Sequence, residues 1–330
     1  MVEHVYYYVS DSVNPYHNLA LQSYIFNNIP DNSMVFLLWQ NSDTVMLGNN
    51  QNPYHECNLS ELELDRCHLA RRDSNGRAIF NDLGCLNYGF FLYQNNYNIV
   101  GQINVIYQAL RKLNLPIYLD SDNEILLDSC YLAENSYLVK QERCMHTGTI
   151  YWDVEKNKRL RILKEGGKRN IINVSEYNPC INLEDIKKNV LQSLADKFGP
   201  AYQLPITDDL EDLIEFYHSY KHIYNTSKTY TIIINENYDF GNTQFYVDMM
   251  RNRISKIDVY MQGEDYDVIE NIHQCFDGLI IDDVTFRNRM FDVENKYKDD
   301  FEKLYRRIKR ETYQIWSIGK SWHKKYLAVY

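Results

Sequence analysis

Hydrophobic residues recur at helical spacing in some segments and form continuous or alternating runs in others, which predicts a mixture of helices and strands. Amphipathic spacing predicts helices at residues 16–27, 59–67, 100–113, 183–198 and 208–217. Apolar runs bounded by turn residues predict strands at 34–39, 45–47, 71–72, 87–92, 125–127 and 145–152. Residues 156–169 are basic and contain glycine, so we expect a loop there.

The C-terminal third of the chain has a different order of elements. Alternating patterns predict strands at residues 230–235, 243–250 and 254–261, and helices follow from about residue 267. The sequence therefore predicts an α+β fold, with a large mixed-sheet domain at residues 1–235 followed by a smaller αβ accessory domain at residues 236–330.

Composition and charge narrow the class of protein. A chain of 330 residues with 45% hydrophobic and 24% charged residues can bury a sizeable core. Its net charge of −10 argues against a nucleic-acid partner, because affinity for phosphate backbones comes mostly from clustered Lys and Arg. The seven cysteines form no CxxC pair, which fits a reducing compartment better than a disulfide scaffold. No targeting leader stands at the N-terminus and no stretch approaches the roughly 18 apolar residues of a membrane span, so we expect a cytoplasmic protein without membrane contact.

Several blocks of residues stand in a fixed order along the first half of the chain. They are residues 36–41 (Phe-Leu-Leu-Trp-Gln-Asn), 51–58 (Gln-Asn-Pro-Tyr-His-Glu-Cys-Asn), 69–84 (Leu-Ala-Arg-Arg-Asp-Ser-Asn-Gly-Arg-Ala-Ile-Phe-Asn-Asp-Leu-Gly), 126–128 (Leu-Leu-Asp) and 146–149 (His-Thr-Gly-Thr). In order and spacing these blocks resemble the lipoate–protein ligase A family of the biotin/lipoate protein ligase superfamily. The resemblance is dense to about residue 150 and faint beyond residue 180, and the C-terminal lobe resembles the family's accessory domain.

The resemblance implies an enzyme that adenylates lipoate or octanoate with ATP and Mg²⁺ and passes the acyl group to a lysine of a lipoyl-carrier domain, of the 2-oxoacid dehydrogenase E2 or glycine-cleavage H type. Some relatives perform only the transfer. It also implies that Trp39 helps to line the acyl tunnel, that Arg72 and Ser74 lie by the adenylate, and that His146 begins the strand facing it. Trp39 in an apolar strand could equally be core, and Asp82 could simply fix a turn.

The glycine-rich turn departs from the family's pattern, which is Arg-x-Ser-Gly-Gly-Gly-x-Val-x-His-Asp-x-Gly-Asn. Here residues 72–85 are Arg-Asp-Ser-Asn-Gly-Arg-Ala-Ile-Phe-Asn-Asp-Leu-Gly-Cys. Asn75 can adopt the left-handed conformation at modest cost, and Gly76 is kept. Arg77 places a long cation where the family has no side chain, so it either fills the ligand's space or supplies a charge there.

The family's lysine, which contacts both the acyl carbonyl and the phosphate, is also missing. The family follows its Asp-Gly-x turn with Lys-x-Ser-Gly-x-Ala, and alignment without a gap from Asp128 to His146 places Tyr131 at the lysine and Glu134 at the glycine. Removing one donor to a developing negative charge typically raises a barrier by about 3–4 kcal/mol. We therefore expect the adenylation half-reaction to be impaired.

A third departure lies in the loop that folds over the adenylate in the family, Lys-Gly-x-x-Ser-Val-Arg-x-Arg-Val-x-Asn. Residues 164–173 keep Arg169 and have Ile171 in place of the second arginine. His218 and His222 lie four residues apart, a spacing that could hold a metal, but without an HExxH core a structural role is favoured and no metal site is predicted.

Two functions remain open at this point. In one, the chain is a pseudoenzyme that keeps the ligase surface and binds a lipoyl domain or a partner ligase subunit, and the residues favour this reading. In the other, it is an active lipoyl or octanoyl ligase or transferase that uses a relocated cation, such as Arg77 or Lys140.

Overall fold

The computed structural model describes residues 2–164, 168–206, 209–224, 230–250, 253–261 and 265–326. It divides into two units, Met1–Ile223 and Tyr224–Tyr330, each of which is considered by itself. The predicted domain boundary after residue 235 lies further along the chain and stays a prediction. Residues 165–167, which belong to the predicted basic loop, and residues 225–229 lie outside the described residues.

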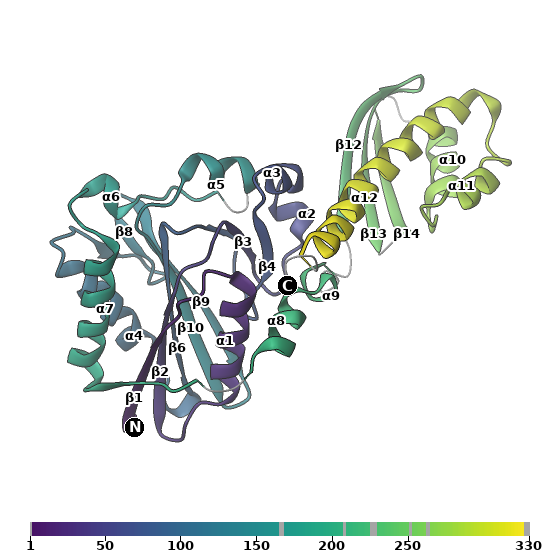
Figure 1. The fold of residues 1–330 in the computed structure, drawn as a ribbon. Coiled ribbons are helices and arrows are strands. Elements are labelled where there is room, and N and C mark those ends of the chain that lie inside the picture. Colours follow the sequence, from purple (N-terminus) through teal and green to yellow (C-terminus); the bar gives the residue numbers. More distant parts are fainter. Residues whose placement is uncertain are drawn as a thin grey trace. The chain divides into compact units, whose positions relative to one another are not determined.

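The first unit contains an eight-stranded mixed sheet (Figure 1) with the strand order β11-β1-β2-β6-β10-β9-β8-β7. β1 pairs in parallel with β2 and β11, and the other neighbours are antiparallel. The strands span His4–Val9 (β1), Ser33–Trp39 (β2), Cys85–Tyr93 (β6), Tyr118–Leu119 (β7), Ile125–Leu127 (β8), Cys130–Lys140 (β9), Arg143–Tyr151 (β10) and Ala201–Gln203 (β11). This mixed sheet with added helices confirms the predicted α+β class.

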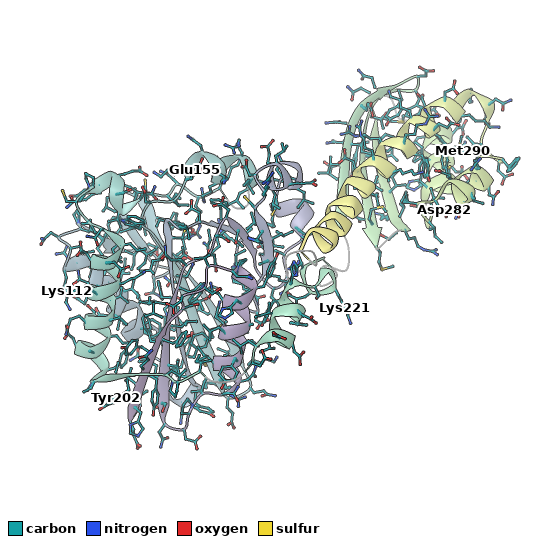
Figure 2. The ribbon with its side chains drawn as sticks, in the orientation of Figure 1. Lys112, Glu155, Tyr202, Lys221, Asp282 and Met290 are labelled. Atoms are coloured by element: carbon teal, nitrogen blue, oxygen red, sulfur yellow. The ribbon has the colours of Figure 1, made fainter. Side chains whose placement is uncertain are left out.

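Two helices, α4 (Ile99–Arg111) and α7 (Leu183–Phe198), cover one face of this sheet (Figure 1). Alternate residues of β2, such as Phe36 and Leu38, pack in a common core with Ile106 of α4 and Val190 of α7. α7 begins with a capping box, in which the side chain of Asn182 accepts a hydrogen bond from a main-chain N–H group that the helix itself leaves unpaired. At the surface Lys112, labelled in Figure 2, pairs with Asp196 at 2.7 Å.

The opposite face of the sheet carries α1 (Pro15–Asn27), which contacts β2, β6 and β10. Asn14 caps α1 by accepting hydrogen bonds from the N–H groups of Tyr16 and His17. A three-stranded sheet of order β4-β3-β5 belongs to the same unit and consists of β3 (Thr44–Leu47), β4 (His68–Arg71) and β5 (Ile79–Asn81). Shorter elements complete the unit: α2 (Pro53–Glu56), α3 (Leu59–Leu64), η1 (Gln94–Asn96), α5 (Lys156–Ile162), α6 (Val174–Tyr177), α8 (Glu211–His218) and α9 (Tyr220–Tyr224).

The second unit contains an antiparallel three-stranded sheet of β12 (Tyr230–Tyr238), β13 (Gly241–Met250) and β14 (Arg253–Met261). Its helices are α10 (Tyr266–Phe276), α11 (Asp283–Arg289), η3 (Asn295–Tyr297) and α12 (Lys298–Tyr326). Alternate residues of β13, among them Phe245, Val247 and Met249, are buried as strand periodicity requires. No described helix is both long and apolar enough to cross a bilayer.

Some elements differ from the sequence prediction. Residues 156–169 were expected to form a loop, but the segment begins with helix α5. Although this segment is basic, Arg159 and Ile162 are both buried on one side of the helix. The predicted helix at 59–67 ends at Leu64, and β4 ends at Arg71 rather than at Arg72. β9 was missed because its burial is only partial and its sequence has no continuous apolar run.

The fully buried guanidinium of Arg71 links three separate segments of the first unit. Nη1 donates hydrogen bonds to the carbonyl oxygens of Gly48, Asn49 and Gln51, at 2.7–2.9 Å. Nε donates to the carbonyls of His222 and Ile223, and Nη2 donates to Ile223. Burial lowers the pKa of Arg71 to about 10, which still leaves the side chain charged at neutral pH. The loop at 48–51 and helix α9 are thus attached to the end of β4.

Replacing Arg71 with lysine should lower the free energy of unfolding of the first unit by about 2–4 kcal/mol. An ammonium lacks the planar fork, so several buried carbonyl oxygens lose their donors. Urea unfolding followed by tryptophan fluorescence measures the change, and Arg66→Lys, at an exposed position of the same unit, is the control. Equal stability of the two variants would contradict the structural role of Arg71.

Candidate functional site

A pocket of about 190 Å³ lies in the first unit, on the face of the large sheet that carries α1. Residues from α1, β2, the small sheet, β6, β9 and β10 line it. The lining residues are Leu19, Gln22, Trp39, Asn41, Met46, Arg72, Gly76, Arg77, Ile79, Asn81, Asn87, Glu124, Glu134, Asn135, Ser136, Thr147, Gly148, Thr149 and Arg169. Residues from three of the five sequence blocks, 36–41, 69–84 and 146–149, therefore line one cavity.

One wall of the pocket is a row of side chains across four neighbouring strands. Trp39 of β2 pairs with Asn87 of β6, Asn87 pairs with Thr149 of β10, and Thr149 pairs with Glu134 of β9. Directly paired residues point to the same face of a sheet, so each side chain in this row lies next to the following one. Trp39, Asn87 and Thr149 are buried, whereas Gly76 and Arg77 are exposed. The pocket thus has an inner end in the sheet and a mouth at the turn of residues 74–77.

Arg72 holds this turn together from inside the pocket. Its Nη2 donates to the carbonyl oxygens of Asn75 and Arg77, its Nη1 to that of Met46, and its Nε to Ser74 Oγ, all at 2.9–3.2 Å. Burial lowers the pKa of Arg72 to about 10, which leaves it protonated at neutral pH. Most of the guanidinium donors are therefore used within the protein.

Gly76 is the residue of the turn that must be a glycine. Its φ is +115°, and a Cβ there would lie 2.8 Å from Nη2 of Arg72. Asn75, a residue type that can adopt the left-handed conformation, is not among the residues of positive φ, and its side chain accepts a hydrogen bond from Asn50. Ser136 Oγ lies 2.7 Å from both Ser74 Oγ and the Asn75 carbonyl oxygen, which joins the turn to β9.

Arg169, another cation of the pocket, is paired inside the protein. Its Nη1 lies 2.9 Å from Glu134 and 3.5 Å from Glu124, and its guanidinium lies 4.2 Å from the centre of the Tyr131 ring. Glu134 also accepts a hydrogen bond from the Tyr151 hydroxyl. The residue at the position of the family lysine, Tyr131, is therefore packed on Arg169 and is not itself a lining residue.

Glu124 has an unusual environment for a carboxyl group. It is 8% exposed, and burial followed by repulsion from Glu134 raises its pKa from the ordinary 4.5 to about 7. It accepts hydrogen bonds from the main-chain N–H and the side-chain amide of Asn135, at 2.8 and 3.1 Å. Two carboxyl groups thus share one guanidinium beside the pocket.

His146 lies outside the pocket, although the sequence placed it beside the ligand. Its Nδ1 is 3.0 Å from Gln102 Oε1 of α4, its Nε2 is 2.8 Å from Asn135 Oδ1, and it stacks on Phe90 and Tyr137. Burial lowers its pKa to about 3, so the ring is neutral. Thr147 and Thr149, on either side along β10, line the pocket instead.

Asp82 stabilises a turn, which was one of the two roles considered for it. Its carboxylate accepts hydrogen bonds from the N–H groups of Gly84 and Glu155, both at 2.8 Å, and Glu155 is labelled in Figure 2. Of the predicted site residues, the structure brings together Trp39, Arg72, Gly76, Arg77 and Arg169 around the pocket. Ser74 and Asn75 support them, whereas Tyr131, Asp82 and His146 do not line the cavity.

Sequence reasoning missed several polar lining residues, chiefly Asn81, Asn87, Glu124, Asn135 and Thr147. A usable signal was the spacing of Thr147 and Thr149, since residues two apart share one face of a strand. Within the described residues, no group of three or more His, Cys, Asp or Glu side chains is placed to hold a metal ion.

Comparisons with known proteins agree on one family. A family model described as the lipoyl protein ligase A/B catalytic domain matches residues 14–195. Lipoate-protein ligase A of Bdellovibrio bacteriovorus is 24% identical over 315 residues, which cover 88% of this chain and 93% of that protein. Lipoate-protein ligase A of Blochmanniella floridana is 29% identical over 259 residues, which cover 74% of this chain and 75% of that protein.

Solved structures share the fold. P. falciparum LipL1, in complex with lipoate, has a TM-score of 0.62 at 19% identity and covers 93% of this chain and 99% of its own. A lipoate-protein ligase A bound with ATP has a TM-score of 0.60 at 16% identity, covering 68% of this chain and 99% of its own. A bipartite lipoate protein ligase of Thermoplasma acidophilum, described with its E2 lipoyl domain, has a TM-score of 0.59 at 15% identity, with 68% and 96% covered.

The raised pKa of Glu124 predicts a pH dependence of stability. A carboxyl whose pKa is higher in the folded state stabilises the fold fully below about pH 4.5, and this contribution is lost as the pH rises through about 7. The difference in unfolding free energy between the native protein and Glu124→Gln should therefore shift against the native protein by about 2–3 kcal/mol between pH 4.5 and 7.5. Denaturant titrations across this range test it, with Glu63→Gln, at an exposed position, as control. Parallel pH profiles for the native protein and Glu124→Gln would contradict the assignment.

Proposed function

The chain belongs to the lipoyl protein ligase A/B catalytic-domain family, and on that premise we propose that it binds an acyl group of the lipoate or octanoate class but has lost most of the adenylation step. In this proposal it serves as a non-catalytic partner of a lipoyl-carrier domain or of a partner ligase subunit. The relatives named lipoate-protein ligase A support the family, and the lost step and the partner are inferences from this chain's own residues.

The pocket supports binding of an acyl chain. Its lining includes the apolar side chains of Leu19, Trp39, Met46 and Ile79, and apolar walls with a few polar groups are typical of small-ligand sites. P. falciparum LipL1, whose structure was solved in complex with lipoate, has the same fold. An acyl chain that enters between Arg77 and Trp39 would have its carboxyl group at the exposed turn.

The Arg169–Glu134 ion pair is the observation on which loss of adenylation rests. At 2.9 Å the Nη1 of Arg169 already has an anionic partner in Glu134, the same nitrogen lies 3.5 Å from Glu124, and the guanidinium packs over the Tyr131 ring. A phosphate would have to displace a carboxylate to reach Nη1 of Arg169, and breaking a partly buried ion pair is costly because it leaves a charge without compensation. With tyrosine in place of the family lysine, developing negative charge also lacks an ammonium.

The groups that would hold ATP and Mg²⁺ are correspondingly weak. Magnesium prefers free carboxylate and phosphate oxygens in octahedral arrangement. The pocket's two carboxylates, Glu124 and Glu134, both lie against Arg169. The residues present therefore do not fit a resident magnesium ion, and no step is assigned to one.

One observation favours an active transferase as the second candidate. Arg77 lines the pocket, is exposed at its mouth, and could supply the charge that the family takes from its lysine. Lys140, the other cation considered, lies at the exposed end of β9 and is not a lining residue. If the native protein transfers acyl groups, Arg77→Ala should lower that activity by about 10²-fold, whereas Lys140→Ala should leave it unchanged.

Restoring the family residues should restore adenylation. The native protein should release pyrophosphate from ATP and lipoate at least about 100-fold more slowly than Tyr131→Lys/Glu134→Gly, because the double variant removes the nearer of the two carboxylates on Arg169 and supplies an ammonium. Pyrophosphate release measures the step, and calorimetry with lipoate alone measures acyl binding. Tyr118→Lys, an exposed tyrosine outside the pocket, is the control. Rapid pyrophosphate release by the native protein would sink the pseudoenzyme proposal.

A carrier or ligase partner should bind even when adenylation fails. The purified chain should retain a lipoyl-carrier domain or a ligase subunit in a pull-down, and Tyr131→Lys/Glu134→Gly should bind the same partner, since Glu134 lines the pocket and Tyr131 packs on Arg169. Absence of binding to either kind of protein, together with measurable lipoate binding, would reduce the proposal to that of an acyl-binding protein.

A further inference from the structure

Two asparagines at the buried end of the pocket have amide groups without hydrogen-bond partners. Asn81 is 1% exposed and Asn87 is 2% exposed, and both line the cavity. Within the described part of the chain, neither Nδ2 atom has a hydrogen-bond acceptor at normal geometry. A buried polar group left unpaired costs about 1–3 kcal/mol, so these groups are expected to find a partner when the pocket is filled.

A chain of hydrogen bonds fixes which end of the Asn81 amide is left unpaired. Asn18 Nδ2 donates to the carbonyl oxygens of Ser12 and Gln40, which can only accept. Asn18 Nδ2 also contacts Asn41 Oδ1, and Asn41 Nδ2 therefore donates to Asn81 Oδ1 at 3.1 Å. The NH₂ group of Asn81 is thus the end left for a ligand, apart from a contact with the Cys85 thiol, a weak acceptor.

Asn87 lies in the row of side chains between Trp39 and Thr149. The Thr149 hydroxyl donates to Asn87 Oδ1 at 2.6 Å, which again leaves the NH₂ group as the unpaired end. Both residues stand at the inner end of the cavity, whereas Arg77 stands at its exposed mouth. The inner end therefore offers donors in a pocket whose other walls include Leu19, Trp39 and Met46.

We propose that Asn81 and Asn87 form a site for an uncharged oxygen acceptor at the inner end of the ligand, so that the pocket selects carboxylic acids whose far end carries a carbonyl oxygen over wholly aliphatic ones. The acceptor is uncharged for the following reason. The guanidinium of Arg72 already donates hydrogen bonds to main-chain carbonyl oxygens. A carboxylate at the buried end would therefore lose its hydration without gaining a cationic partner from Arg72. The acid group of the ligand remains at the mouth with Arg77.

This inference rests on the proposed acyl-binding function and adds the class of acid that the pocket prefers. An aliphatic chain end would leave both amides dry and unpaired, as happens when a site built for a hydrogen bond receives an analogue that lacks it. A water held by the two amides would be the alternative partner, and in that case a carbonyl on the ligand would gain nothing.

Titration calorimetry of the full chain with 7-oxooctanoate and octanoate, two acids of equal length, tests the site. The dissociation constant should be about tenfold lower for 7-oxooctanoate, the size expected for one or two hydrogen bonds. Asn87→Leu and Asn81→Asp should each reduce this ratio at least threefold. Asn81→Asp keeps the oxygen that accepts a hydrogen bond from Asn41 and replaces the NH₂ donor with a second oxygen. Asn104→Leu, outside the pocket on α4, should keep the ratio.

The outcomes separate this inference from the function on which it rests. Equal affinity of the native protein for the two acids, within twofold, would overturn the inference and leave acyl binding intact. No binding of octanoate, 7-oxooctanoate or lipoate would overturn both. Should Asn87→Leu fail to fold, Asn87→Leu/Thr149→Val removes the hydroxyl that the single change leaves unpaired, and the same loss of preference is expected.

Discussion

The arrangement of the first unit depends on two consecutive arginines that bind main-chain carbonyl oxygens in place of acidic side chains. Arg71 joins the loop at residues 48–51 to helix α9, and Arg72 joins the turn at residues 74–77 to the end of β3. Successive residues of an extended chain point in opposite directions, so one strand end can fix two loops. The loops also contact each other directly, since the N–H of Asn49 donates to the carbonyl of Ser74. A buried guanidinium suits this task because its five donors are held in one plane.

This constraint explains which changes the turn tolerates. Gly76 has both a positive φ and an Arg72 nitrogen where its Cβ would lie, so it is held to glycine. Asn75 and Arg77 are exposed and need no positive φ, so side chains have been gained at these positions without strain on the backbone. Gly48 is similarly restricted, because a Cβ there would lie 2.2 Å from the carbonyl oxygen of Gly76. Loss of two glycines from the motif therefore changes the chemistry at the mouth of the pocket more than it changes the shape of the turn.

Local pattern predicted the elements whose burial is regular and missed those whose burial depends on distant partners. The apolar run of β2 and the amphipathic α7 were placed within a residue or two, because both are covered along a whole face or side. β9 is half-buried along most of its length, and pairing with β10 and β8 makes it a strand. The same distinction holds for the pocket. Motif spacing located Trp39, Arg72, Gly76, Arg77 and Arg169, whereas Asn87 becomes visible only through the register that sets it between Trp39 and Thr149. His146 takes the face of β10 opposite to Thr147 and Thr149, because strand alternation decides which face a side chain takes, and its role beside the ligand stays a prediction.

In the pocket, the carboxylate of Glu134 and an anionic ligand compete for the guanidinium of Arg169. A ligand phosphate or carboxylate that uses Nη1 of Arg169 can bind only in the fraction of molecules in which the pair is open, and its apparent dissociation constant rises by the reciprocal of that fraction. With one molecule in about a hundred open, an intrinsic dissociation constant of about 1 µM would be measured as about 100 µM. Because Glu124 stands beside the same guanidinium and titrates near neutrality, the number of charges competing for Arg169 itself varies across the physiological pH range. Protonation of Glu124 thus removes one of the two negative charges that compete with a ligand anion for Arg169.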